Sequence, residues 1–190
     1  MTNRGIGFTR WIEGQAQGVR QLAELAPSAR LDPWAFAEAL DVLVRFPADI
    51  PGLDPGDLEH LSSMDDRRWS GASAVLPNGV LAVLLNPLHS PARNSVTIME
   101  EICHVYLGHK PSLSSSTADR LVIRDFRPSD EKQAYAVAAA AILPAPRLEL
   151  LLSRGVGIQE LAAGEGVSQP LVNYRLNVTG LRSRLRRSAV

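Results

Sequence analysis

The sequence predicts an α+β fold, and three observations point to it. Apolar residues recur at helical spacing in several segments, most clearly in 7–26 and 90–108. Two β-rich runs flank an Asn78-Gly79 turn, which is the pattern of an antiparallel hairpin. The chain has 190 residues, 45% of them hydrophobic, enough for one core with a small appendage. We therefore expect a short antiparallel sheet packed against helices, followed by a helical C-terminal segment.

The first half of the chain is expected to alternate helices with short strands. Residues 7–26 form the first helix, and a second begins at Pro33 behind the N-cap residue Asp32, since proline is favoured at the first helical position. The run VLVRFPADI, residues 42–50, reads as a short strand broken by its proline. A loop rich in proline, glycine and aspartate follows, with one helical turn at 57–61, and then the hairpin.

The second half is expected to be mainly helical. A long helix begins at the cap residue Ser90 and ends at Gly108. The alanine-rich run SDEKQAYAVAAAAILP forms the next helix, capped by Ser129 and stopped by Pro144. Three short helical segments separated by glycines complete the chain. We expect a main domain over residues 1–146 and a helical appendage over 147–190.

Composition narrows the class of protein. The longest apolar runs are too short to span a bilayer, the N-terminus has no apolar leader, and a lone cysteine, Cys103, excludes an internal disulfide. We expect a cytoplasmic protein that does not bind membranes. The appendage holds seven arginines and three glutamates, a net charge of +4 on an otherwise acidic chain. This charge indicates either an acidic partner such as nucleic acid or a solvated helix end.

The 90–108 helix carries the residues with the clearest chemistry. Glu100, Glu101 and His104 project from one face, since residues four apart lie about 40° apart on a helical wheel. In helical zinc-peptidase motifs the i and i+4 side chains bind the metal, and the residue after the first ligand is the general base. Glu100 and His104 are thus candidate ligands and Glu101 a candidate base. The EExxH pattern alone also fits a solvated helix face. His109 is expected to be a cap residue or to support the site.

Glu131 is the candidate third ligand. It opens the alanine-rich helix 27 residues after His104, where a carboxylate can reach a site on a neighbouring helix. The alternative is a first-turn glutamate that interacts with the helix dipole. Two further residues are weaker candidates for the active site. His89 could line an active-site cleft, and Tyr135 could donate a hydrogen bond to an oxyanion.

The segments TIMEEICHVYLGH and EKQAYAVAAAAILP together resemble the ImmA/IrrE family of intracellular metallopeptidases. Members typically show T-I-x-H-E-x-x-H-x-x-L-G-H and then E-x-x-A-x-x-F-A-x-x-L-L-x-P, and the resemblance is best over residues 69–144. It implies a zincin-like core, with His104 and Glu131 as metal ligands and Glu101 as general base. Glu100 stands where the family has its first histidine.

The resemblance also implies a cofactor and a partner. The cofactor is a divalent metal, zinc in the first place, while manganese or iron(II) are alternatives because a second carboxylate favours harder ions. The partner is a protein substrate, such as a transcriptional repressor. The expected function is metal-dependent cleavage of that regulator.

Two other functions stay open at this stage. The first is a non-catalytic, peptidase-like scaffold that binds the regulator without cutting it. The second is a DNA-binding regulator, because residues 158–181 have helix-turn-helix spacing, with Ser168 as the cap of the second helix. In that case Gln169, Asn173 and Arg175 would face bases or phosphates, assisted by the terminal RSRLRR. The alternative is a small helical subdomain that packs on the main domain.

Overall fold

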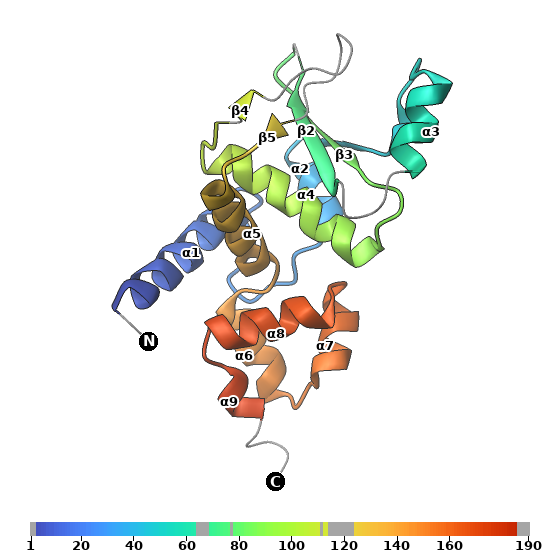
Figure 1. Cartoon of the computed structure of the whole chain (residues 1–190). Coiled ribbons are helices and arrows are strands. Elements are labelled where there is room, and N and C mark those ends of the chain that lie inside the picture. The colour runs from blue at the N-terminus through green and yellow to red at the C-terminus, as the bar shows by residue number, and fades with distance from the viewer. Residues whose placement is uncertain (1–2, 64–68, 77, 111, 114–123, 186–190) are drawn as a thin grey trace.

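The computed structural model describes residues 3–63, 69–76, 78–110, 112–113 and 124–185, and it confirms the α+β class (Figure 1). The helices in this part are α1 (Asn3–Gln21), α2 (Pro33–Ala39), α3 (Pro55–Ser63), α4 (Pro91–Tyr106), α5 (Pro128–Ile142), α6 (Ala145–Ser153), α7 (Ile158–Glu165), α8 (Gln169–Val178) and α9 (Arg182–Leu185). A 3-10 turn, η1, covers Pro47–Asp49. The strands are β1 (Leu43–Arg45), β2 (Gly71–Val75), β3 (Leu81–Leu85), β4 (Ser112–Leu113) and β5 (Arg124–Asp125).

The main sheet has the strand order β1-β3-β2. Strands β2 and β3 form the expected antiparallel hairpin, and Gly79 adopts a φ of +84° in its turn. The sheet differs from the antiparallel one predicted, because β1 pairs with β3 in parallel. Between these two strands the chain passes through α3 and β2, which lets it return in the same direction. A second, two-stranded sheet joins β4 and β5.

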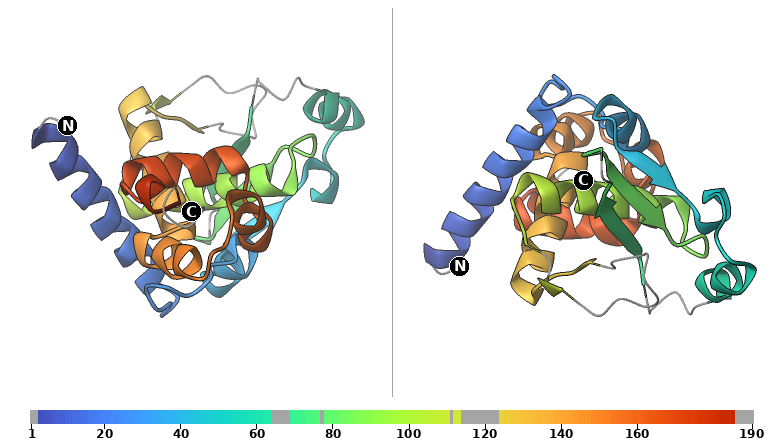
Figure 2. Two further views of the ribbon diagram at one scale, coloured as in Figure 1. Left: turned by 90° about the horizontal axis from the view of Figure 1, so that it is seen from below. Right: turned by 90° about the horizontal axis from the view of Figure 1, so that it is seen from above.

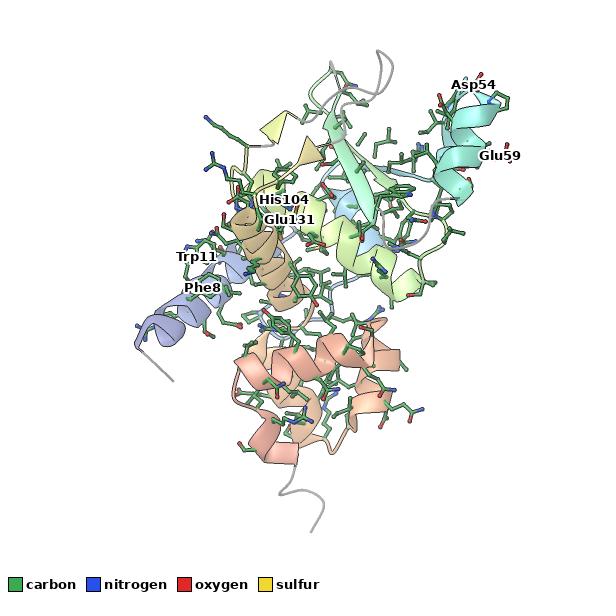
Figure 3. All side chains as sticks on the ribbon, in the orientation of Figure 1. Phe8, Trp11, Asp54, Glu59, His104 and Glu131 are labelled. Atoms are coloured by element: carbon green, nitrogen blue, oxygen red, sulfur yellow. The ribbon has the colours of Figure 1, made fainter. Side chains whose placement is uncertain are left out.

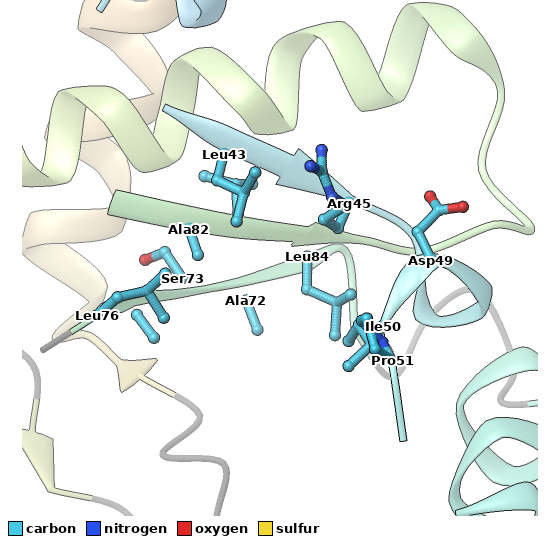
Figure 4. A pocket seen from close by; sticks show the side chains of 12 residues that line it. Leu43, Arg45, Asp49, Ile50, Pro51, Ala72, Ser73, Leu76, Ala82 and Leu84 are labelled. Carbon is cyan, nitrogen blue, oxygen red and sulfur yellow. The ribbon is translucent and has the colours of Figure 1, made fainter. Parts of the chain in front are cut away.

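One face of the main sheet is covered by α4. Val83 and Leu85 of β3 point to this side and belong to the hydrophobic core. The opposite face carries a cavity of about 260 Å³, lined by side chains that include Ala72, Ala82 and Leu84 (Figure 4). Alternation along each strand therefore separates a core face from an open apolar face.

Helix α5 runs through the centre of the molecule, where α1 and α4 pack against it (Figures 1 and 2). Its alanines are buried, and their small side chains let the neighbouring helices approach closely. The predicted cap was wrong by two residues: the N-cap is Arg127, and Ser129 lies in the first turn. The physical reason is Pro128, whose fixed φ suits the first helical position.

A buried arginine fastens the C-terminal helices to the rest of the chain, and a second arginine joins two of these helices to each other. Arg175 of α8 is 1% exposed; its Nε donates to the carbonyl of Leu143 at 2.9 Å and its Nη2 pairs with Glu13 of α1 at 2.6 Å. Arg147 of α6 pairs with the buried Glu165 of α7 at 2.7 Å. The expectation that Arg175 faces DNA was therefore wrong, because this side chain anchors α8 to α1 and α5.

Other features of the appendage agree with the prediction. Ser168 caps α8 by accepting a hydrogen bond from the Leu171 amide, and Gly166 ends α7 with a φ of +68°. Gln169 is exposed, and Asn173 accepts a hydrogen bond from Arg182. The final arginines, 186 and 187, lie outside the described residues. The domain boundary at residue 146 and the helix-turn-helix-like role stay predictions.

Among the described residues, no single helix has the length and apolar character to cross a membrane. Helices α5 and α6 meet those criteria only as a pair, joined at a bend of 40°. The eight residues from Ala134 to Ala141 in α5 are apolar apart from Tyr135, and all but Tyr135 are buried in the core.

Candidate active site

The end of α4 brings two histidines together. Leu107 is the C-cap residue, and Gly108 follows it with a φ of +68°, a conformation that glycine adopts without strain. The amide of His109 then donates to the carbonyl of His104, and the amide of Gly108 donates to that of Val105. These two bonds form a Schellman motif, which folds the chain back over the last turn of the helix. The sequence HVYLGH thereby places His109 beside His104.

His104 is held on three sides. It is 2% exposed, and its ring stacks on Phe126 with centroids 3.7 Å apart and planes 26° from parallel. The Nδ1 atoms of His104 and His109 lie 3.1 Å apart, so one of them donates a hydrogen bond to the other. The remaining nitrogen of His104, Nε2, lies 3.6 Å from Oε2 of Glu131 (Figure 3 labels both residues).

This arrangement suits a metal-binding imidazole. A neutral histidine that presents the lone pair of Nε2 must carry its proton on Nδ1, and His109 Nδ1 lies where it can accept that proton's hydrogen bond. Phe126 excludes water from one face of the ring. His109 thus orients the His104 ring through its Nδ1 atom, while Nε2 on the opposite side faces the carboxylate of Glu131.

Glu100 lies close to other carboxylates. Its burial raises its pKa from 4.5 to about 8, and the charges of Glu131 and Glu101 add to the increase, while Arg93 opposes it. In the absence of a cation, Glu100 therefore holds its proton at neutral pH. A divalent cation in this position would favour the ionised carboxylate.

The other predicted residues fall around this centre. Glu101 is half-buried on α4. Tyr135 of α5 is 37% exposed; burial of its hydroxyl, then Tyr174 and Glu100, raise its pKa, so it remains a hydrogen-bond donor. Cys103 is fully buried as core filler, as expected, and burial raises the pKa of its thiol. His89 is 7% exposed in the loop before α4 and so does not line an open cleft.

The donor set agrees in part with a metal site. Two ligands at about 2.1 Å from one tetrahedral zinc ion stand roughly 3.4 Å apart. The 3.6 Å between Nε2 of His104 and Oε2 of Glu131 is close to that separation. However, within the ranges that the structure covers, no three His, Cys, Asp or Glu side chains converge on one point. Glu100 carries a carboxylate that could bind zinc, but this carboxylate does not converge on one point with His104 and Glu131.

Sequence reasoning missed Phe126. Its side chain packs on both histidines, with ring centroids 3.7 Å from His104 and 6.4 Å from His109. It is the aromatic residue that directly precedes the Arg127-Pro128 start of α5. The sequence could have indicated Phe126, because a residue just before α5 lies at the same end of this helix as Glu131.

Comparison with known proteins identifies the family of this chain. The Peptidase_M78 family model, described as the IrrE N-terminal-like domain, matches residues 59–177 and so extends from α3 into α8. The matched region contains the whole candidate site and continues past residue 146. No curated protein gives a significant match. The fold is metallopeptidase-like, and the family is typically metal-dependent. Since the match covers more than half of the 190 residues, the chain belongs to the family of the IrrE N-terminal-like domain.

Proposed function

We propose that this protein is a metal-dependent endopeptidase that cleaves a regulatory protein, such as a transcriptional repressor. The observation that carries the proposal is the opposition of His104 Nε2 and Glu131 Oε2 at 3.6 Å, with His109 behind the imidazole. A buried histidine oriented toward a carboxylate at ligand separation is typical of half a zinc site. Glu100 is the proposed remaining ligand.

A divalent metal held by these three residues would polarise a peptide carbonyl and lower the pKa of water. Glu101 follows the first ligand in sequence and would accept a proton from the attacking water and pass it to the leaving amine. His109 keeps the His104 proton on Nδ1, and Phe126 shields the ring from solvent. Tyr135 offers a neutral hydroxyl toward the carboxylate cluster, where it can donate to a developing oxyanion.

Two features favour a second candidate, a peptidase-like scaffold that binds a regulator without cutting it. Glu100 replaces a histidine of the family pattern, and among the described residues no group of three donors has converged. In such a protein the clustered carboxylates would serve recognition, and Glu101 would have no chemical role.

Glu101→Gln separates the two candidates, because glutamine keeps the size of the side chain but cannot act as a base. Wild-type and variant protein are each incubated with an extract of cells that express the chain, and new protein N-termini are identified by mass spectrometry. The endopeptidase produces N-termini that are absent with Glu101→Gln, although metal content and fold are unchanged. Equal sets of N-termini, together with equal capture of a partner protein, would instead establish the scaffold.

A further inference from the structure

Two partly exposed tyrosines connect the candidate active site with the C-terminal helices. Helix α8 packs against α5 (Figure 1), and Tyr174 of α8 meets Tyr135 of α5 at this contact. The ring centroids lie 5.6 Å apart, and the ring planes are 50° from parallel. Tyr135 is 37% exposed and Tyr174 is half-buried, so a molecule bound at the surface can contact both rings.

This tyrosine pair begins beside two candidate metal ligands. Tyr135 lies one helical turn after Glu131 on the same side of α5, because residues four apart are about 40° apart around a helix. The charge of Glu100 also acts on the Tyr135 hydroxyl, since it is the third cause, after burial and Tyr174, that raises the pKa of Tyr135. The pair therefore extends from the neighbourhood of Glu100 and Glu131 to α8.

The residue after Tyr174 fixes this part of α8. The buried guanidinium of Arg175 donates to the carbonyl of Leu143 at the end of α5 and pairs with Glu13 of α1 at 2.6 Å. A tyrosine ring on a helix held in this way loses little conformational entropy when a ligand binds. The family match covers residues 59–177, so it includes both Tyr174 and the candidate site.

The chemistry of the tyrosine pair favours a large apolar side chain as its ligand. Two aromatic rings at an angle present apolar faces on which a third ring or an aliphatic chain can pack. The nearby carboxylate of Glu13 is paired with Arg175. A divalent metal would neutralise Glu100 and Glu131 in the same way. These three carboxylates would then give a basic side chain no unpaired anion to bind.

We propose that Tyr135 and Tyr174 form a subsite that binds a large apolar side chain of the protein substrate. Tyr135 lies about 6 Å along α5 from Glu131, the Tyr174 ring lies a further 5.6 Å away, and an extended peptide advances about 3.4 Å per residue. The bound side chain therefore belongs to a residue about two to four positions from the cleaved bond. This distance from the bond rests on the endopeptidase function, whereas the binding of an apolar side chain does not.

The first experiment compares the bonds cut in a mixture of peptides from a digested cell extract, identified by mass spectrometry. Tyr174→Phe keeps the ring, Tyr174→Ala and Tyr174→Gln remove it, and Tyr106→Gln on the far side of α4 is the control; circular dichroism shows that each variant is folded. We expect the wild type, Tyr174→Phe and the control to favour aromatic or large aliphatic residues two to four positions from the cut bond. The variants without the ring should show this preference about 2- to 12-fold less. An unchanged preference in these variants, or a preference for lysine or arginine in the wild type, would refute the subsite.

The second experiment measures binding without cleavage, in a Glu101→Gln background. The immobilised full chain retains peptides from a random-sequence library, and the retained peptides are sequenced. Aromatic and large aliphatic residues should be enriched about 2- to 12-fold more strongly with Tyr174→Phe than with Tyr174→Gln. Equal enrichment with both variants, or none with either, would overturn the proposal. If the wild type cuts no bond in the first experiment, the endopeptidase function fails, and this comparison still decides whether the subsite exists.

Discussion

Replacing Glu100 with glutamine should stabilise the metal-free protein at neutral pH. Burial, with Glu131 and Glu101 nearby, raises the pKa of Glu100 from 4.5 to about 8 in the folded state. The unfolded chain ionises this carboxyl near its ordinary value. Between these two pKa values the folded state keeps a proton that the unfolded state has released, so the free energy of unfolding decreases as pH rises.

The size of the effect follows from the shift. A pH of 7 is about 2.5 units above the pKa of this carboxyl in the unfolded chain. Keeping the proton in the folded state therefore lowers the free energy of unfolding by up to about 3 kcal/mol. Glutamine has a similar size and no charge, so Glu100→Gln removes the penalty. At about pH 4 both states of the wild type are mostly protonated, and the two proteins should differ by less than about 0.5 kcal/mol.

Urea denaturation with a chelator, at about pH 4 and pH 7, measures this difference. Glu38→Gln, at an exposed carboxyl of α2, controls for the loss of one charge. A stabilisation of Glu100→Gln that is the same at both pH values would refute the reasoning, and so would destabilisation at pH 7. With metal bound the sign should reverse, because the glutamine variant then lacks an anionic ligand.

Three further predictions concern packing and the support of the site. Arg175→Met should lower the free energy of unfolding by about 3–5 kcal/mol in urea, since it leaves a carboxylate of α1 without its partner, whereas Arg182→Met on the exposed surface should change it by less than about 0.5 kcal/mol. Gly71→Ala should cost about 1–3 kcal/mol because its β-carbon collides with α4, while Gly14→Ala, with open space around it, should stabilise α1 by about 0.5–1 kcal/mol. His109→Ala should weaken zinc binding about 10–100-fold in a competition titration, and unchanged affinity would contradict the role of its ring.

The parts of the fold that sequence reasoning predicted well are local. Ser90 and Pro91 begin α4 and Gly108 ends it, because capping and a positive φ depend on neighbouring residues alone. The Asn78-Gly79 turn fixed the β2–β3 hairpin in the same way. The candidate ligands His104 and Glu131 could also be predicted from the sequence, since a helical pattern places each of them at the end of its helix.

The features that escaped prediction depend on distant parts of the chain. Helical spacing alone could not show that Arg175 pairs with Glu13, a residue 162 positions earlier. The parallel partner of β1 follows from a crossover that no local pattern encodes.

The metal content of protein purified without chelator tests the central claim most directly. Elemental analysis of the wild type, Glu100→Ala and His104→Ala would be combined with circular dichroism to show that each variant is folded. We predict about one zinc, manganese or iron ion per chain in the wild type and a loss of that metal in both variants. A folded wild type that holds no metal, even after incubation with each of these ions, would contradict the account.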